Sequence, residues 1–400
     1  MAFQESNRME QRVALLRDFD LGIFSVSELC RRYGISRETF YSWKERRMSG
    51  DLAWFLDRTS APGSCPHAMS AEVESAVLAL RGRFRHFGPK KLRAKLMQAQ
   101  PNHGAPSASS IGALLKRKGL IDAQCRRKVP KALGEVLDVA TSPCEEWAMD
   151  FKGWFRTRDG TRCDPLTVTD TASRYLVGVQ IIAPRFIDTQ AVLTQLFQAH
   201  GMPQYLRSDN GSPFGSSAAG GLSKLAIWLM LHGVEPRFIP PGSPQDNGRH
   251  ERMHRTLKAE TSKPAADNAT AQQVRFDDFQ KRYNDERPHE ALGQQTPSSH
   301  YQTSPRPYQL KPDAPWYDAE HQVRKVRKDG TIKWKGSLIF ISETLHGQPI
   351  GLAEQENGLH IVRFMHRDLG VLDRHQKLQP YAPPRAKFKR EVIARAEKST

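Results

Sequence analysis

A chain of 400 residues is too long for one ordinary domain, so two to four domains are expected. A hydrophobic fraction of 38%, with 7 Trp and 18 Phe, excludes a fully disordered chain. Sixty Lys and Arg against 43 Asp and Glu leave a net charge of +17, which favours a nucleic-acid partner over the alternative of an ordinary basic protein.

The cysteines and the apolar runs exclude two further classes of protein. Five scattered Cys without a C-x-x-C pair argue against a disulfide framework and against a zinc knuckle. The N-terminus lacks an apolar signal region, and no apolar run is long enough to span a bilayer. We therefore expect a protein of the cytoplasm of a bacterial-type cell, associated with the nucleoid and not with a membrane.

Residues 1–50 are predicted to form a helix-turn-helix domain. Gly34 suits the tight turn between two helices, and Ser36 is a good N-cap for the second. That helix directs Phe40 and Trp43 inward and leaves a polar and basic outer face, which is typical of a helix that enters the major groove. The alternative is a plain three-helix bundle. The residues expected to contact DNA from its outer face are Arg37, Thr39, Tyr41, Ser42 and Lys44.

A second helix-turn-helix or winged-helix-like unit is predicted over residues 67–125, after a breaker-rich linker at 59–66. Helices are expected from Ser70, from Gly88 and from Ser107 to Lys118, where Gly119 ends the last. A basic strap at 126–131 follows. The candidate DNA contacts of this unit are Lys90, Lys91, Lys116 and Arg117.

Residues 140–303 show the pattern of a mixed sheet covered by helices. Three strands in a meander come first, and helices and strands then alternate, an order that matches the ribonuclease-H-like fold. The predicted strands are 146–155, 165–170, 174–182, 205–209 and 236–239, and the predicted helices are 187–200, 222–231 and 245–259.

The C-terminal part is predicted to be a small β domain over residues 319–383. Two-residue turns such as Asp329-Gly330 and Asn357-Gly358 favour tight hairpins. About fifty residues of short strands suggest an SH3-like barrel. The basic tail at 384–400 completes a multidomain α+β chain.

Three carboxylates of the mixed-sheet domain are candidates for metal binding. Asp150 lies within an apolar strand, Asp209 ends a short buried strand, and Glu251 lies in a helix. A buried carboxylate is costly unless something compensates it, and clustered carboxylates are ligands that Mg²⁺ prefers. Two metal ions roughly 4 Å apart would serve both oxygens of an in-line phosphodiester displacement.

Five stretches in this order resemble the motifs of DDE-class insertion-sequence transposases, which have a retroviral-integrase-type catalytic core. The stretches are 147–153, 168–175, 207–214, 244–258 and 283–292. The resemblance implies that Asp150, Asp209 and Glu251 are the catalytic residues and hold two Mg²⁺, with Mn²⁺ as a substitute. It also implies cleavage of element ends by hydrolysis and joining of their 3′-hydroxyls to target DNA by transesterification.

One departure from the family pattern is an interval between Asp209 and Glu251 that is longer than in many relatives. Residues 216–221 are small and are predicted to be an inserted flexible loop that leaves catalysis intact. The resemblance further implies DNA contacts by Arg255 and Lys258, four and seven positions after Glu251 on one helical face. The alternative for these two cations is charge pairing with Glu251.

Four further polar residues have two interpretations each. Asp170 is a possible ligand but fits better as a turn residue, and Asp246 is a possible rival to Glu251 but fits an N-terminal helix position. His254 either lies on the same side of the helix as the candidate metal site or is exposed to solvent. Asn210 is expected, with Asn247, to orient ligands or phosphates.

The leading functional hypothesis is a transposase that recombines and integrates DNA. A ribonuclease-H-like nuclease is the second enzyme reading, and the flanking helix-turn-helix units argue against it. A non-enzymatic regulator derived from an inactive transposase is the third, and the presence of all three carboxylates argues against that. Because two ends must be held together, we expect a homo-oligomer, at least a dimer, assembled on double-stranded DNA.

Overall fold

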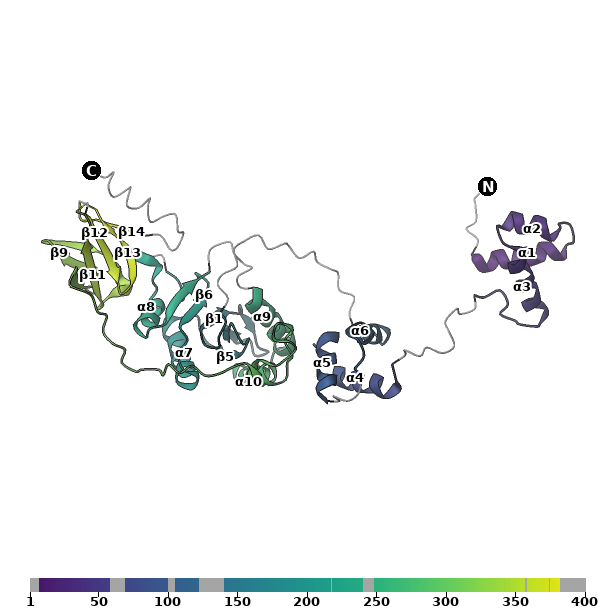
Figure 1. Ribbon diagram of the computed structural model, residues 1–400, viewed down its shortest axis with the longest axis horizontal. Coiled ribbons are helices and arrows are strands. Elements are labelled where there is room, and N and C mark those ends of the chain that lie inside the picture. Colours follow the sequence, from purple (N-terminus) through teal and green to yellow (C-terminus); the bar gives the residue numbers. More distant parts are fainter. Residues whose placement is uncertain are drawn as a thin grey trace. The chain divides into compact units, whose positions relative to one another are not determined.

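The computed structural model describes residues 7–57, 69–99, 105–121, 140–216, 218–239, 248–356, 358–373 and 375–381, and Figure 1 labels its elements. The chain separates into two compact units, Met1–Ala68 and Met69–Thr400. The predicted linker at 59–66, the basic strap at 126–131 and the tail at 384–400 lie outside the described residues.

The first unit contains three helices, α1 (Arg8–Asp20), α2 (Val26–Tyr33) and α3 (Arg37–Met48). Gly34 ends α2 with φ of +66°, a left-handed conformation that glycine adopts without steric cost. The Ser36 hydroxyl accepts a hydrogen bond from the Thr39 amide and so caps α3. Phe40 is buried, and Trp43 packs against the same small core, as the sequence pattern indicated.

The second unit begins with α4 (Ala71–Arg83), α5 (Pro89–Ala99) and α6 (Ala108–Arg117). The hydroxyls of Ser70 and Ser107 cap α4 and α6 at the predicted positions. One face of each helix contributes to a shared apolar cluster around Val77, Leu92 and Ile111. The three helices are confirmed by the structure, whereas their role in DNA binding remains a prediction.

A five-stranded mixed sheet forms the centre of the second unit, in the order β5-β4-β1-β6-β7. Within this sheet β1, β4 and β5 form an antiparallel meander, and β6 and β7 run parallel to β1. The bounds are β1 (Glu146–Phe151), β4 (Pro165–Asp170), β5 (Leu176–Ile181), β6 (Tyr205–Ser208) and β7 (Glu235–Phe238). The predicted mixed sheet is therefore confirmed.

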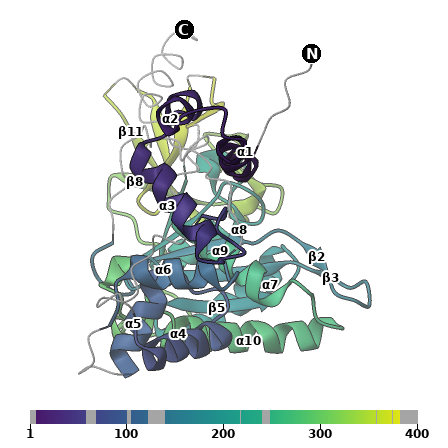
Figure 2. The same cartoon turned by 90° about the vertical axis from the view of Figure 1, so that its right-hand side faces the viewer.

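Helices cover both faces of this sheet. On one face α7 (Phe186–His200) and α8 (Lys224–Leu231) pack over an apolar cluster that includes Trp147, Leu193 and Leu229. On the other face α9 (Gly248–Thr261) and α10 (Ala269–Asp285) pack against β5 through Met253, Phe276 and neighbours. Figure 2 shows α10 lying along the sheet. Burial of both faces explains why β1, β4 and β5 each contain at least four consecutive buried residues.

A buried ion-pair group ties the first strand to its parallel neighbours. The Glu146 carboxylate, whose side chain is 3% exposed, accepts contacts from Arg207 at 3.2 Å and from Arg237 at 3.1 Å. These three residues belong to β1, β6 and β7, respectively. Burying a carboxylate is tolerated here because two guanidinium groups compensate it.

Three elements of this unit, two short strands and a helix, were not among the predicted ones. The strand predicted at 146–155 stops at Phe151, and a short hairpin follows, made of β2 (Phe155–Arg156) and β3 (Arg162–Cys163). The 17-residue helix α10 was also missed. Its signal is present, since Asn268 caps it and Gln272, Phe276, Phe279 and Tyr283 are buried at helical spacing.

The C-terminal part is all β, apart from one short turn at Glu343–Leu345, as predicted. A five-stranded antiparallel sheet has the order β14-β13-β12-β11-β8, and a separate hairpin pairs β10 with β9. The bounds are β8 (His321–Lys325), β9 (Thr331–Trp334), β10 (Ser337–Phe340), β11 (Pro349–Glu354), β12 (His360–Phe364), β13 (Arg367–Leu372) and β14 (Leu378–Pro380). Closure into an SH3-like barrel remains a prediction.

The loop at 216–221, predicted to be flexible, is packed against this β domain. Its 3₁₀ turn, Ala219–Gly221, contacts β13, and a side chain added at Gly220 would meet Leu369 at 2.9 Å. Leu222 and Ile227 of the sheet domain share one apolar cluster with Trp334 and Val362 of the β domain. The segment is a loop, as predicted, and its described residues pack on the β domain because this contact buries apolar surface.

The described part of the chain contains three free cysteines, and its helices are too short or too polar to cross a bilayer. Cys30, Cys144 and Cys163 are all buried thiols. None of the described helices has the length and hydropathy that crossing a bilayer requires.

Candidate active site

The first two predicted carboxylates lie at the same end of neighbouring strands. In the parallel pairing of β1 with β6, Trp147 is opposite Leu206 and Ala148 is opposite Arg207. The pairing ends at Ala148 and Arg207; Asp150 lies two residues further along β1, and Asp209 lies two residues further along the neighbouring chain, directly after β6. Since adjacent strands are about 4.8 Å apart, the two backbones approach closely at this edge.

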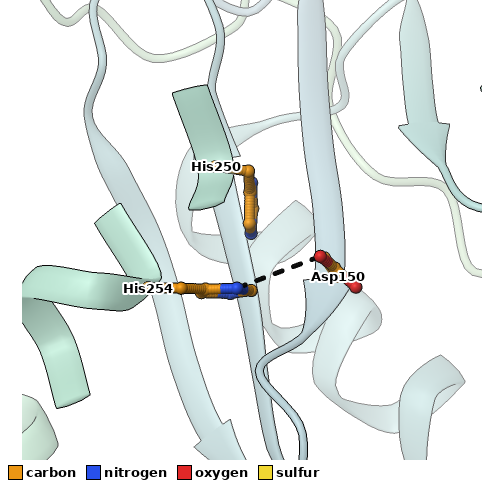
Figure 3. A group of neighbouring side chains, drawn as sticks. All are labelled: Asp150, His250 and His254. Carbon is orange, nitrogen blue, oxygen red and sulfur yellow. Dashed lines mark ion pairs between the residues drawn. The ribbon is translucent and has the colours of Figure 1, made fainter. Parts of the chain in front are cut away.

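Two histidines of α9 lie against the Asp150 strand. His250 and His254 are 3% and 6% exposed, and both ring Nε2 atoms contact the Thr167 hydroxyl of β4, at 2.6 and 2.7 Å. Nδ1 of His254 lies 3.9 Å from Oδ2 of Asp150, the pair joined by the dashed line in Figure 3. Thr167 therefore fixes α9 on the sheet beside Asp150.

Counting protons at Thr167 assigns the histidine tautomers. A threonine hydroxyl has one hydrogen to donate and two lone pairs. Thr167 donates to the backbone carbonyl of Asp150 at 3.0 Å. Donation from Nε2 of both histidines satisfies this hydroxyl, and in that tautomer Nδ1 of His254 presents a lone pair to a carboxylate oxygen. Two acceptors that face each other fit a cation between them.

Burial keeps both histidines neutral. It lowers the pKa of His250 to about 3, with a further contribution from Arg207. It lowers the pKa of His254 to about 2, with contributions from His250 and Lys152. A neutral imidazole beside a carboxylate is compatible with a divalent cation, whereas an imidazolium would repel it.

Among the described residues, the potential ligand atoms within 4.8 Å of one another come from Asp150, His250 and His254. Asp209 and Glu251 are not in this group, and both are exposed. Oδ1 of Asp209 accepts a hydrogen bond from the Gly211 amide at 3.0 Å. The structure therefore places the predicted triad around one edge of the sheet without bringing its three carboxylates together.

Glu251 lines a surface pocket next to this edge. It shares the pocket with Lys152, two residues beyond Asp150, and with His254. The predicted DNA contacts Arg255 and Lys258 line the same pocket and are exposed. An exposed carboxylate beside a row of cations is an arrangement that suits a phosphate-bearing ligand.

The contact of His250 and His254 with Thr167 was not predicted from the sequence. His250 was not singled out, and the exposed alternative for His254 is wrong. A signal exists, because His250, Met253, His254 and Leu257 recur at i, i+3, i+4 and i+7, the pattern of the buried face of a helix.

The other polar residues of the core have structural partners. Asp170 is fully buried and accepts hydrogen bonds from the amides of Cys144 and Ser173, both at 2.8 Å, which supports the turn interpretation. The Asn210 amide donates to the Ile239 carbonyl at 2.8 Å and so joins the ends of β6 and β7. Asp246 and Asn247 lie outside the described residues.

The remaining candidate DNA contacts differ in accessibility. On α3, Arg37 and Tyr41 are exposed, while Thr39, Ser42 and Lys44 are half-buried, and the Lys44 ammonium lies over the Phe19 ring. Lys116 and Arg117 are exposed on α6. Lys90 pairs with Glu290 at 2.5 Å, and burial lowers the pKa of the half-buried Lys91 to about 7.

A buried histidine outside the site gives a pH prediction. Within the described structure, Nε2 of His289 is buried without a hydrogen-bond partner, and the ring packs edge-on against Tyr283. Burial, with Lys91, Arg287 and Arg174 nearby, lowers its pKa to about 3. The unfolded chain, with a histidine pKa near 6.5, therefore binds a proton that the folded chain excludes.

We expect this difference to reduce stability as the pH falls from about 6.5 towards 3, and to contribute nothing above pH 7. Between pH 7 and pH 5 the loss attributable to His289 is on the order of 2 kcal/mol. Denaturant unfolding of the parent and of His289→Gln at both pH values measures it. The variant should lose less stability than the parent, and equal losses would contradict the prediction.

Comparison with known proteins agrees with this architecture. Two family models described as "Integrase core domain" match residues 140–244 and 232–297. An uncharacterised 39.2 kDa protein of insertion element IS476 of Xanthomonas euvesicatoria is 27% identical over 300 residues, 72% of this chain and 75% of the relative. An uncharacterised 31.7 kDa protein of insertion element IS407 of Burkholderia multivorans is 27% identical over 219 residues, 54% of this chain and 75% of the relative.

The chain therefore contains an integrase core domain, whose class implies polynucleotidyl transferase activity and DNA integration. More particularly, the chain is similar to proteins of two insertion elements. Among solved structures, the HTLV-2 integrase catalytic core in complex with magnesium covers 42% of this chain and 99% of that one, at 14% identity and a TM-score of 0.32.

Proposed function

We propose that this protein cuts DNA at the ends of its own element and joins the freed ends to target DNA. The observation that supports this most is the parallel pairing of β1 with β6, since Asp150 and Asp209 lie at the same end of these neighbouring strands, near a helix that carries Glu251. Hydrolysis would break a P–O3′ bond and leave a 3′-hydroxyl and a 5′-phosphate. Joining would form a new P–O bond and release a 3′-hydroxyl of the target strand.

The residues at the site fit divalent cations such as Mg²⁺ or Mn²⁺. Asp150, Asp209 and Glu251 offer the hard oxygen ligands that Mg²⁺ takes, and His254 directs a lone pair at the same Asp150 oxygen. Bound there, two such ions would activate the attacking oxygen and stabilise the leaving one.

The chain's own groups have separate roles in this proposal. Thr167 and His254 hold Asp150 in place from β4 and α9. Lys152, Arg255 and Lys258 bind the phosphates on either side of the cut. Helix α3, with exposed Arg37 and Tyr41, recognises the element end, and a dimer or larger assembly formed on DNA holds two ends together.

The test is an in vitro reaction of the full chain with a labelled duplex that carries the element end. Nicked and strand-transfer products should appear with Mg²⁺ or Mn²⁺ and disappear with EDTA. Tight binding of the end without products under any metal would contradict the enzymatic proposal and favour a DNA-binding regulator.

A further inference from the structure

The hairpin β2–β3 follows directly on the Asp150 strand and projects from the core, as Figure 2 shows. Phe155 stands opposite Cys163, and both face inward, the Phe155 ring packing edge-on against Phe276 of α10 at 6.3 Å. Because side chains alternate along a strand, Trp154, Arg156 and Arg162 share the outer face. The hairpin therefore has one face anchored in the core and one face free for a ligand.

The outer face combines an exposed aromatic ring with two cations. Trp154 is 58% exposed, and the guanidinium groups of Arg156 and Arg162 lie 5.8 and 5.3 Å from its ring centroid. The two arginines are direct cross-strand partners. Arg162 pairs with Asp164 through two contacts of 2.8 Å, and Arg156 donates to the Gly160 carbonyl at 2.7 Å, so both guanidinium groups are held in place beside the ring. An exposed ring with two fixed guanidinium groups beside it fits a ligand that is flat and anionic.

The hairpin is also held rigidly at its tip. The amides of Arg158 and Asp159 donate to the carbonyls of Ala266 and Asp267, each at 3.0 Å, and the Arg158 side chain pairs with Asp267 at 3.0 Å. These contacts fasten the turn of the hairpin to the connection between α9 and α10. The ring is thus presented on a preorganised element, the condition under which a stacking residue loses little entropy on binding.

Trp154 lies close along the chain to the residues proposed to act at the cleavage point. Trp154 lies four residues beyond Asp150 and two beyond Lys152, which lines the pocket with Glu251. Four residues of extended chain reach at most about 14 Å, which corresponds to about four steps along a nucleic-acid strand at roughly 3.4 Å each. A base stacked on Trp154 would therefore lie within a few nucleotides of the phosphate being cut.

We propose that the outer face of β2–β3 binds an unpaired base next to the cleavage point, with Trp154 stacking on the base and Arg156 and Arg162 holding its flanking phosphates. This inference rests on the proposed function in DNA cleavage. Bases inside an intact duplex stack on one another, so only a frayed, melted or extruded base offers a free face to the ring. Stacking is tolerant of base identity, because every base has a π-face.

The test compares binding of the full chain to two labelled duplexes of arbitrary sequence by fluorescence anisotropy, one fully paired and one with mismatched terminal base pairs. The parent should bind the frayed duplex about tenfold more tightly, since stacking of one base is worth about that factor. Trp154→Ala should lose this preference and keep the affinity for paired DNA. Trp154→Phe, which keeps an aromatic face, should retain part of it.

Trp316 provides the matched control, because its side chain is 82% exposed and lies outside the hairpin. Trp316→Ala should keep the preference for frayed DNA. A 2-aminopurine at the unpaired position should be quenched by the parent and by Trp316→Ala, but not by Trp154→Ala.

Two outcomes would overturn the inference: a parent without preference for the frayed duplex, or a Trp154→Ala variant that keeps it. If the parent still cuts and joins element ends, either result removes the hairpin role alone. A parent that binds neither duplex and yields no products would remove the proposed function as well.

Discussion

Asp209→Asn should abolish both strand cleavage and strand joining while leaving the protein folded and able to bind DNA. The amide keeps the shape of the carboxylate and the hydrogen bond from the Gly211 amide, but it removes the negative charge that a divalent cation requires. Loss of a ligand forfeits several kcal/mol of transition-state stabilisation, which corresponds to a rate at least about a thousandfold lower.

The measurement is product formation on the labelled element-end duplex in Mg²⁺, with binding followed in parallel. Asp278→Asn is the matched control, because it makes the same chemical change at an exposed position of α10. The control should react like the parent. Full activity of Asp209→Asn would show that the metal-binding carboxylates lie elsewhere.

Glu146→Ala should have the largest effect on stability. Removing this carboxylate leaves Arg207, whose side chain is 11% exposed, without its buried counter-charge, and also releases Arg237. Breaking a buried ion pair by deleting one partner typically costs about 3–5 kcal/mol. Because Arg207 lies two residues before Asp209, we expect activity to fall together with stability.

Chemical denaturation of the parent and variant measures this cost. Asp267→Ala serves as the comparison, since it breaks an ion pair with Arg158 in which both side chains are more than half exposed. An exposed pair contributes little, about 1 kcal/mol or less. Equal destabilisation by the two substitutions would contradict the assigned role of the buried group.

Much of the fold follows from signals that lie close together in the sequence. Serine residues that begin helices, such as Ser36 and Ser107, act where they stand, because a cap bonds to an amide three residues away. The strand Pro165–Asp170 was predicted to the residue, since six buried positions between breakers leave few alternatives. Hairpin β2–β3 was missed because each of its strands has only two residues, too few for a periodic pattern.

The candidate site likewise has features that local sequence patterns predict and features that only the tertiary structure shows. The sequence by itself determined that Asp150 lies in a buried strand, that Asp209 ends another, and that Glu251 lies in a helix in which cations follow it. These are local patterns of composition and spacing. Only the tertiary structure decided that β1 and β6 are parallel neighbours, so that the two aspartates lie at the same end of the sheet. It also decided that Thr167 binds His250 and His254, and that residues near 220 pack on the β domain. Such pairings depend on which surfaces become buried against each other, and this depends on residues far apart in the chain.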